Sequence, residues 1–294
     1  MILLVREDRE YLREPGDTLE TDLGVLEIPE DPAPGETLAT HLGTEFTVRE
    51  LRGPDFARHF QRSGAPMLPR DIGLVIGHTG VGAGDRVLDA GTGTGVLAAY
   101  LGRCGAEVLT YERDAEAAAV ARENMALAEV GDTVDVREDD VLEAIEERPA
   151  GTGGVETNAG NPDLRSDEPT TGNGGKDSNG NMEKGTGSAE ERATAGDPLA
   201  GGLGEPFDLL TLDTADAPAV IERAPELLVP GAFCAVYSPF VESAREVVET
   251  ARGAGLAVDT YETIQRELDV DERGTRPTTA GVGHTGFLSI CRFE

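Results

Sequence analysis

The chain has 294 residues, and its 25 lysines and arginines stand against 56 aspartates and glutamates, for a formal net charge of -31. A hydrophobic fraction of 38% with 28% charged residues is typical of globular proteins and excludes a fibrous or wholly disordered chain. No apolar run approaches the roughly 20 residues of a membrane span, and no signal-peptide pattern follows Met1. Three widely separated cysteines show no metal-ligand spacing. We therefore expect a reduced, cytoplasmic protein of one or two domains, without a membrane or metal partner.

The negative charge weighs against a nucleic-acid partner, because it repels phosphate. The kind of charge matters as well: Lys176 and Lys184 are the only lysines, and tryptophan is absent. This composition resembles that of proteins adapted to high intracellular salt, such as those of halophilic archaea. At about 1 M salt the Debye length is about 3 Å, so self-repulsion is screened. The alternative is an acidic binding protein of a general kind.

Short apolar stretches alternate with Pro/Gly turns at the start of the chain, which predicts a small β-rich N-terminal domain over residues 1–60. Strand and helix patterns then alternate, which predicts an α/β fold with a parallel, doubly wound sheet. The expected strands are 86–89, 108–111, 134–136, 207–212, 233–237, 256–262 and 286–292, and the expected helices are 96–103, 115–128, 219–228 and 244–252. We expect a loop over residues 273–283.

Residues 149–206 interrupt this alternation. The segment is acidic, rich in Gly, Asn, Thr, Ser and Asp, and free of aromatic residues. It buries too little apolar surface to offset the entropy of ordering, so we predict a long disordered insertion. The second domain is then divided into residues 61–148 and 207–294.

The strongest motif is an apolar strand that runs into the glycine-rich turn from Asp89 to Gly95. Glycines there allow the backbone to approach a ligand and leave helix N–H groups free. A dinucleotide fingerprint would have a small residue at Val96, whereas the spacing here is GxGxG. Acidic residues follow the next two strands, at Glu112 and Asp140. Asp140 has an alternative role as a helix N-cap.

These residues resemble the motifs of class I S-adenosylmethionine-dependent methyltransferases, which have a Rossmann-like doubly wound sheet. The resemblance implies S-adenosyl-L-methionine as cofactor, with its methionine end at the first acid and the glycines, its ribose at Glu112 and its adenine at Asp140. The cofactor-binding residues that it implies are Asp89, Gly91, Thr92, Gly93, Thr94, Gly95, Glu112, Arg113, Asp140 and Asp213.

Flanking segments narrow the resemblance. The segments RSGAPMLPRDIG at 62–73 and GHTGFL at 283–288, with the strand end at Asp213, resemble the tRNA (adenine-N1)-methyltransferase family that modifies the T-loop adenosine. The resemblance covers residues 45–148 and 207–294. It implies methylation of N1 at tRNA position 58, with position 57 as a further candidate, and a homotetramer. Leu68, His284 and Thr285 would shape the site. The family pattern has Gln and Tyr where this chain has Ala65, Pro66 and Leu68.

The resemblance assigns the catalytic role to Asp213. Adenine N1 already carries a lone pair, so alignment supplies most of the rate. A carboxylate near the exocyclic amine stabilises the developing positive charge and accepts a proton. The alternative role of Asp213 is a cap of the following helix.

One segment offers local positive charge, since residues 49–70 hold five arginines and two acids. We expect phosphate contacts from Arg52, Arg58, Arg62 and Arg70, and we expect the interleaved Phe56 and Phe60 to face the core. Two other functions remain open: a methyltransferase that acts on a protein or small molecule, and a non-catalytic RNA-binding partner subunit that keeps the fold.

Overall fold

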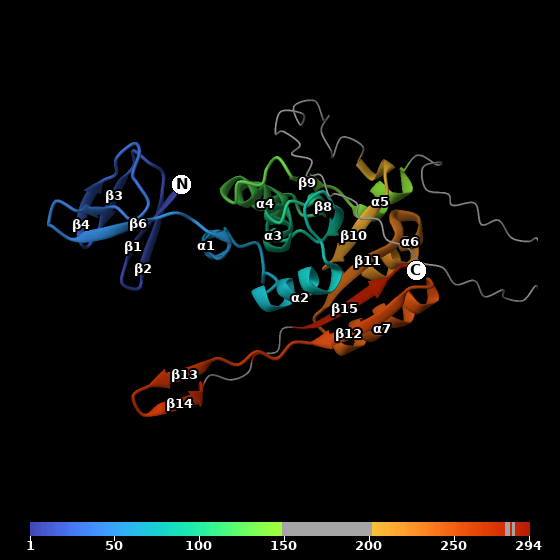
Figure 1. Cartoon of the computed structure of the whole chain (residues 1–294). Helices are drawn as coiled ribbons and strands as arrows, with labels where there is room; N and C mark the ends of the chain where they lie inside the picture. The colour runs from blue at the N-terminus through green and yellow to red at the C-terminus, as the bar shows by residue number, and fades with distance from the viewer. Residues whose placement is uncertain (149–201, 280–282, 284–285) are drawn as a thin grey trace, which may run out of the picture.

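In a computed structural model that describes residues 1–148, 202–279, 283 and 286–294, the chain forms a small N-terminal β module, a larger α/β body and a projecting hairpin (Figure 1). Four strands of the module form an antiparallel sheet in the order β2-β1-β6-β5, and two more pair as a separate hairpin. Side chains alternate along these strands, so Leu4, Phe46 and Val48 gather on one face as a small core. The strands are β1 (Ile2–Arg6), β2 (Arg9–Arg13), β3 (Thr18–Thr21), β4 (Gly24–Glu27), β5 (Thr37–Ala39) and β6 (Glu45–Arg49).

The connector to the body contains helix α1 (Gly53–His59). Phe56 and Phe60 are buried in the core that the body shares with Leu3 of the module, so the prediction that these rings face the core is confirmed. Buried Asn124 fixes the end of the connector, because its amide exchanges two hydrogen bonds of 3.0 Å with the backbone of Gln61.

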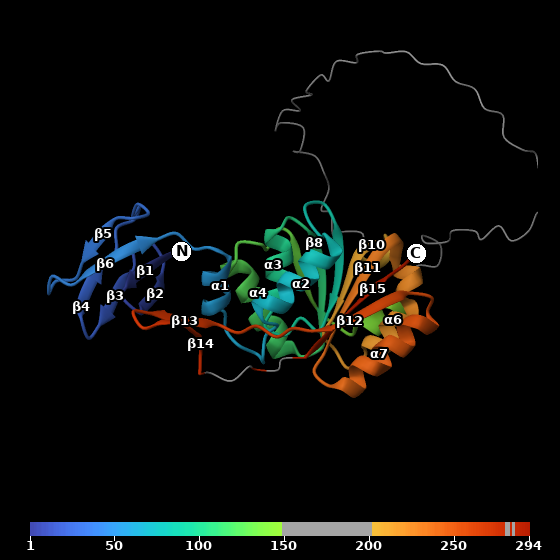
Figure 2. The same ribbon diagram turned by 60° about the horizontal axis from the view of Figure 1, so that its bottom comes forward.

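The body is a seven-stranded sheet in the order β12-β15-β11-β10-β7-β8-β9, with helices on both faces (Figures 1 and 2). The chain runs outward from β7 through β8 to β9 and then returns to β10 on the other side of β7. This reversal opens a crevice at the carboxyl ends of β7 and β10, where ligands bind in such sheets. The strands are β7 (Arg86–Ala90), β8 (Glu107–Glu112), β9 (Val134–Glu138), β10 (Phe207–Leu212), β11 (Leu228–Ser238), β12 (Ala257–Glu262) and β15 (Phe287–Arg292).

Alternating apolar residues of the central strands feed two separate cores. Val87 and Leu209 point into the core with α2, α3 and α4, whereas Leu88 and Leu210 point into the core with α5, α6 and α7. Strands buried on both faces explain the continuous apolar runs of the sequence. The helices are α2 (Pro69–Thr79), α3 (Val96–Arg103), α4 (Ala115–Leu127), α5 (Val141–Glu146), α6 (Ala217–Leu227) and α7 (Val241–Gly253).

The α/β doubly wound prediction is confirmed, with three local corrections. Strand β15 runs antiparallel between β11 and β12, because no helix crossover joins it to β12. The loop expected over residues 273–283 contains β14 (Gly274–Pro277), which pairs with β13 (Leu268–Asp271) as a hairpin. Helix α6 begins before the expected residue 219, since a proline is tolerated in a first helical turn.

The predicted insertion is described only at its end. Residues 149–201 lie outside the described residues, whereas residues 202–206 belong to the folded body. A short 3-10 turn (Gly202–Gly204) places Leu203 in the core, and Glu205 forms an ion pair with Arg86. The insertion boundary at 206 was therefore placed too late. Among the described residues, no helix is long and apolar enough to cross a membrane.

Candidate active site

The glycine-rich turn connects β7 to α3 and packs against the ends of two neighbouring strands. Gly91 has a φ of +91°, and a Cβ atom there would collide with the main-chain carbonyl of Asp213 after β10. Its N–H donates to the carbonyl of Tyr111 in β8 at 3.0 Å. By contrast, a Cβ atom on Gly93 would meet nothing closer than 4.0 Å. The turn therefore needs glycine at 91 for packing and leaves open space at 93.

Asp89 lies beneath this turn and is only 4% exposed. The parallel register places Thr110 of β8 and Thr211 of β10 directly beside it. Both hydroxyls donate to its carboxylate, that of Thr110 at 2.6 Å. Burial raises the pKa of Asp89, and the two hydroxyl hydrogen bonds act in the opposite direction. The sequence patterns did not single out the two threonines, because their role depends on strand order.

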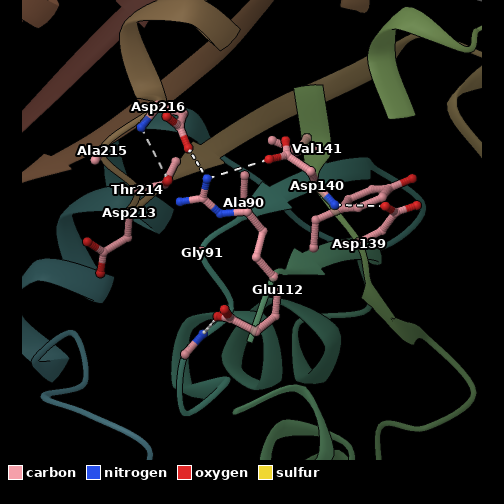
Figure 3. Close-up of a pocket in the computed structure, with 13 residues that line it drawn as sticks. Ala90, Gly91, Glu112, Asp139, Asp140, Val141, Asp213, Thr214, Ala215 and Asp216 are labelled. Atoms are coloured by element: carbon pink, nitrogen blue, oxygen red, sulfur yellow. Dashed lines mark hydrogen bonds and ion pairs between the residues drawn. The ribbon is translucent and has the colours of Figure 1, made fainter. Parts of the chain in front are cut away.

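A cavity of about 330 Å³ opens in front of the turn, at the carboxyl ends of β7, β8, β9 and β10 (Figure 3). Glu112 lines it and accepts hydrogen bonds from the N–H groups of Gly93 at 2.9 Å and Asp114 at 3.0 Å. Asp140 lines it as well and caps α5, with Oδ1 accepting from the Leu142 N–H at 2.8 Å. Asp140 therefore does act as a helix N-cap. Its second oxygen, Oδ2, faces the cavity, where it lies 3.5 Å from Arg113 Nη1.

Asp213 stands where three cavities meet. It lines the cavity in front of the turn, and it lines a narrow cavity of about 40 Å³ behind the turn with Ala65, Pro66 and Met67. It also lines a third cavity of about 420 Å³ on the side of α7. Its N–H donates to the Ala90 carbonyl at 2.9 Å, which fixes the start of the 213–216 turn against β7.

The third cavity uses residues that the sequence analysis missed. Tyr237, Ser238 and Phe240 come from the end of β11 and the residues just after it, and Ser243 lies on α7. Phe240 is 65% exposed, an unusual state for an aromatic side chain. A phenylalanine two residues after an apolar strand was the available signal.

The surroundings of Asp213 shift its titration. Asp213 is exposed to solvent at the mouths of these cavities, and the protein packed behind it removes part of its hydration. This partial desolvation, together with the negative charge of Asp89, raises the pKa of Asp213 from 3.8 to about 6. The carboxyl group is therefore poised close to neutral pH, as expected of a functional acid.

This raised pKa predicts a stabilising substitution. Between pH 3.8 and about 6 the folded protein holds a proton that the unfolded chain has lost, so stability falls as the pH rises through this window. Asp213→Asn removes the decline. Because solvent screens the site, we expect the variant to be more stable by about 1 kcal/mol above the window, or a few degrees in Tm, and unchanged below it. Thermal unfolding of both ligand-free proteins from pH 3.5 to 8 measures this, and equal stability at pH 8 contradicts it.

Comparisons with known proteins agree with this geometry. Residues 74–152 match the family described as "Methyltransferase small domain". The chain is 29% identical, over 98% of its length and 92% of the relative, to the tRNA (adenine(57)-N(1)/adenine(58)-N(1))-methyltransferase TrmI of Methanocaldococcus jannaschii. It is 25% identical, over 89% of its length and 82% of the relative, to the tRNA (adenine(58)-N(1))-methyltransferase TrmI of Thermus thermophilus.

Solved structures share the fold. The TrmI structure of Aquifex aeolicus matches with a TM-score of 0.65 and 19% identity, over 99% of this chain and 95% of that one. A SAM-dependent O-methyltransferase of Thermotoga maritima matches with a TM-score of 0.71 and 20% identity, over 99% and 92% of the two chains. The chain is thus similar to the TrmI methyltransferases over nearly its whole length. The fold of the TrmI-like chain is accordingly the class I methyltransferase fold.

The segment at 62–73 reaches the site of the TrmI-like chain through Ala65, Pro66 and Met67. Leu68, which we expected to shape the site, instead precedes α2 and is 39% exposed, outside the residues that line the cavities described above. Its neighbour Met67 lines the narrow cavity behind the turn instead. His284 and Thr285 lie outside the described residues.

The arginines of the connector are partly neutralised. Arg49 and Arg58 both form ion pairs with Asp55 and with Glu10 of β2, at 2.5–3.3 Å. Glu10 lies 39 residues before Arg49, so the count of charges over residues 49–70 could not include it.

The other connector arginines differ in their exposure. Arg52 is exposed beside Glu50, at 2.8 Å, and Arg62 is exposed as well. Arg70 is 10% exposed and donates to the Gly283 carbonyl at 3.0 Å. The structure therefore turns Arg70 inward, against the expectation that it meets phosphate. Over the described ranges, no group of three His, Cys, Asp or Glu side chains is placed to hold a metal.

Proposed function

We propose that the TrmI-like chain transfers a methyl group from S-adenosyl-L-methionine to N1 of the T-loop adenosine of tRNA. The supporting observation is the position of Asp213, which borders both the cavity of the glycine turn and the third cavity. A methyl donor in the cavity of the glycine turn and a base in the third cavity would meet at this carboxylate. Both TrmI relatives are tRNA (adenine(58)-N(1))-methyltransferases, and that of Methanocaldococcus jannaschii also acts at adenine 57, which supports the choice of substrate.

The described residues fit the cofactor. Glu112 presents a carboxylate at the end of β8, where it can accept hydrogen bonds from both ribose hydroxyls. Asp140 Oδ2 faces the cavity beside Arg113 and has a second lone pair that can accept from the adenine amine. Gly93 leaves the space that the donor requires, since a Cβ there would meet nothing closer than 4.0 Å. When bound, the cofactor would supply the methyl group of its sulfonium, and the rest of the cofactor would leave as a neutral thioether.

Asp213 performs the remaining chemistry. Methylation of adenine N1 would place a positive charge on the ring. The Asp213 carboxylate accepts a hydrogen bond from the exocyclic amine, holds N1 in line, and takes the amine proton as it becomes acidic. Because N1 lies on the Watson–Crick edge, the target base must leave its stack to reach the pocket.

The third cavity would receive this base, with Phe240 as its stacking surface. Stacking of a base on an aromatic side chain contributes about 1–3 kcal/mol, so we expect Phe240→Ala to lower kcat/KM for tRNA by about tenfold or more. Cofactor affinity should not change, because Phe240 lies outside the cavity of the glycine turn. Val241 is a matched control, being 59% exposed but absent from the residues that line the third cavity. Equal losses in Phe240→Ala and Val241→Ala would contradict the stacking role.

Phosphate contacts would come from the exposed arginines of the connector, Arg52, Arg58 and Arg62. The body as a whole repels phosphate, so binding depends on this local surface and on the screening of the remaining charge. The acidic, lysine-poor composition supports a saline cytoplasm as the working environment.

The hairpin of β13 and β14 supports an oligomer, with the homotetramer as our proposal. It projects from the body and exposes Leu268 at 55% and Val270 at 76% (Figure 1). A two-stranded hairpin is marginally stable by itself, so a second copy that covers it would stabilise it. We expect Val270→Glu to lower the mass measured by light scattering in molar salt, and Val270→Ile to keep it. An unchanged mass in the glutamate variant excludes this hairpin from the contact.

The decisive experiment for the function is methyl transfer itself. The protein is incubated at molar salt with labelled S-adenosylmethionine and unmodified tRNA, and the nucleosides are analysed for 1-methyladenosine. A matched tRNA with guanosine in place of the T-loop adenosines is the control. We expect label only in the first tRNA. Cofactor binding without label in tRNA would refute the proposal and favour another substrate or a non-catalytic partner subunit.

A further inference from the structure

Arg113 connects three turns around the cavity of the glycine turn. It follows Glu112 at the end of β8, and its Nη1 lies 2.9 Å from Asp216 Oδ2 and 3.5 Å from Asp140 Oδ2. Figure 3 shows dashed lines that join Asp140 and Asp216 through one guanidinium nitrogen. Asp140 follows β9, whereas Asp216 follows β10. One side chain therefore links the cofactor side of the site to the turn that carries Asp213.

The charge balance makes this link specific. Among the described residues that line this cavity, Arg113 is the one cation, and five are acids: Glu112, Asp139, Asp140, Asp213 and Asp216. Without the guanidinium, the carboxylates that face each other across the cavity would repel. The Arg113 side chain is 57% exposed, so the strength of its ion pairs depends on how much water the cavity holds.

Asp216 has an unusual arrangement for its position. It is the N-cap of α6, yet its side chain makes no capping hydrogen bond and reaches Arg113 instead. An aspartate at this position normally accepts from the N–H groups of the helix. Its own N–H donates to Thr214 Oγ1 at 3.3 Å within the 213–216 turn. The start of this turn is fixed by Ala90, and its end is held by the ion pair with Arg113.

We propose that Arg113 is a positioning residue which, through Asp216, couples occupancy of the cofactor cavity to the placement of Asp213. Filling the cavity displaces water from around the guanidinium, and the attraction between Arg113 and Asp216 becomes stronger as the local dielectric falls. The 213–216 turn is then held more firmly when the donor is present. The effect of this coupling on methyl transfer rests on the proposed function. The stiffening of the 213–216 turn by a bound ligand does not.

Hydrogen exchange tests the coupling without any tRNA. The full chain is compared with and without S-adenosylhomocysteine, and exchange is followed in peptides that contain residues 213–220. In the wild type we expect the ligand to slow this exchange about tenfold. In Arg113→Met and in Asp216→Asn, at saturating ligand, the slowing should be lost. Equal protection of the peptide in wild type and both variants would overturn the proposal.

Kinetics then separate positioning from simple binding or folding. We expect each single variant to lower kcat about tenfold with little change in KM for tRNA, and the double variant to be no worse than either single one. Exchanging the two charges, with Arg113→Asp and Asp216→Arg, should restore part of the loss. Arg223→Met removes a comparable ion pair on α6, at 2.7 Å from Glu226, and should leave kcat unchanged. Multiplying losses in the double variant would contradict the coupling. If the wild type binds S-adenosylhomocysteine and shows protection but does not methylate tRNA, the proposed function fails and the coupling stands.

Discussion

Asp213→Ala is expected to lower kcat for tRNA methylation by about two to four orders of magnitude, the usual contribution of a positioned acid or base. In the proposed function Asp213 meets the reacting base at the junction of the cavities, and the pairing of β7 with β10 does not involve its side chain. Binding of S-adenosylmethionine should therefore be preserved in calorimetry. Asp135→Ala, which removes an exposed carboxylate on β9 that pairs with Arg137, is the control and should keep full activity.

The same carboxylate predicts the pH dependence of the reaction. Desolvation and the charge of Asp89 raise the pKa of Asp213 to about 6, and the reaction requires the ionised form. Because kcat/KM for tRNA reports the ionisation of the free enzyme, it should rise as the pH increases through about 6 and then level off. Full activity in Asp213→Ala, or a flat profile down to pH 4.5, would remove Asp213 from the catalytic role.

Gly91→Ala is expected to abolish activity and to destabilise the body. The backbone at this position has a φ of +91°, which costs a residue with a Cβ about 1–2 kcal/mol. The added atom would also press on the main-chain carbonyl of Asp213, which cannot rotate away as a side chain could. Displacement of Asp213 by about 1 Å can cost about 100-fold in rate. We expect a loss of at least 2 kcal/mol in the free energy of unfolding, or roughly 4–8 °C in Tm.

Gly231→Ala separates strain from displacement of the site. Gly231 has a φ of +88°, yet a Cβ atom there would meet nothing within 4 Å. This variant should lose only the conformational cost, about 1–2 kcal/mol, and should keep its methyltransferase activity. If both variants lose the same stability and both stay active, the close approach of Gly91 to Asp213 is not a requirement of the fold.

The residues around the cavity of the glycine turn could be predicted, because each sequence pattern that points to them lies within a few consecutive residues. A buried strand, a turn with glycines at 91, 93 and 95 and a following helix occupy consecutive residues. Glu112 and Asp140 each stand directly after a strand, and the carboxyl ends of neighbouring parallel strands must meet at one edge of the sheet. The structure places Gly91, Gly93, Glu112 and Asp140 around one cavity, together with Asp213, whereas Gly95 lines the narrow cavity behind the turn.

The substrate half was less predictable. Phe240 and Tyr237 line the third cavity only because β11 lies beside β10 and α7 packs back over the sheet. Leu68 was expected at the site because it lies in the segment 62–73. It is instead the residue before α2, and its neighbour Met67 lines the narrow cavity behind the glycine turn. Helix and strand patterns fix which face of an element is buried, but not which loop residue faces a cavity.

The fold class and the acids at the ends of successive strands could be predicted from the residues alone, because hydrophobic periodicity and turn chemistry act over a few neighbouring residues. How the charges pair depends on the folded chain. Glu10 neutralises Arg49 and Arg58 from another strand, and Arg113 reaches Asp216 across about 100 residues of chain. The energy of an ion pair depends on distance and burial, so the pairing of charges in the folded chain, and not the net charge of -31, sets the local electrostatic field at the active site.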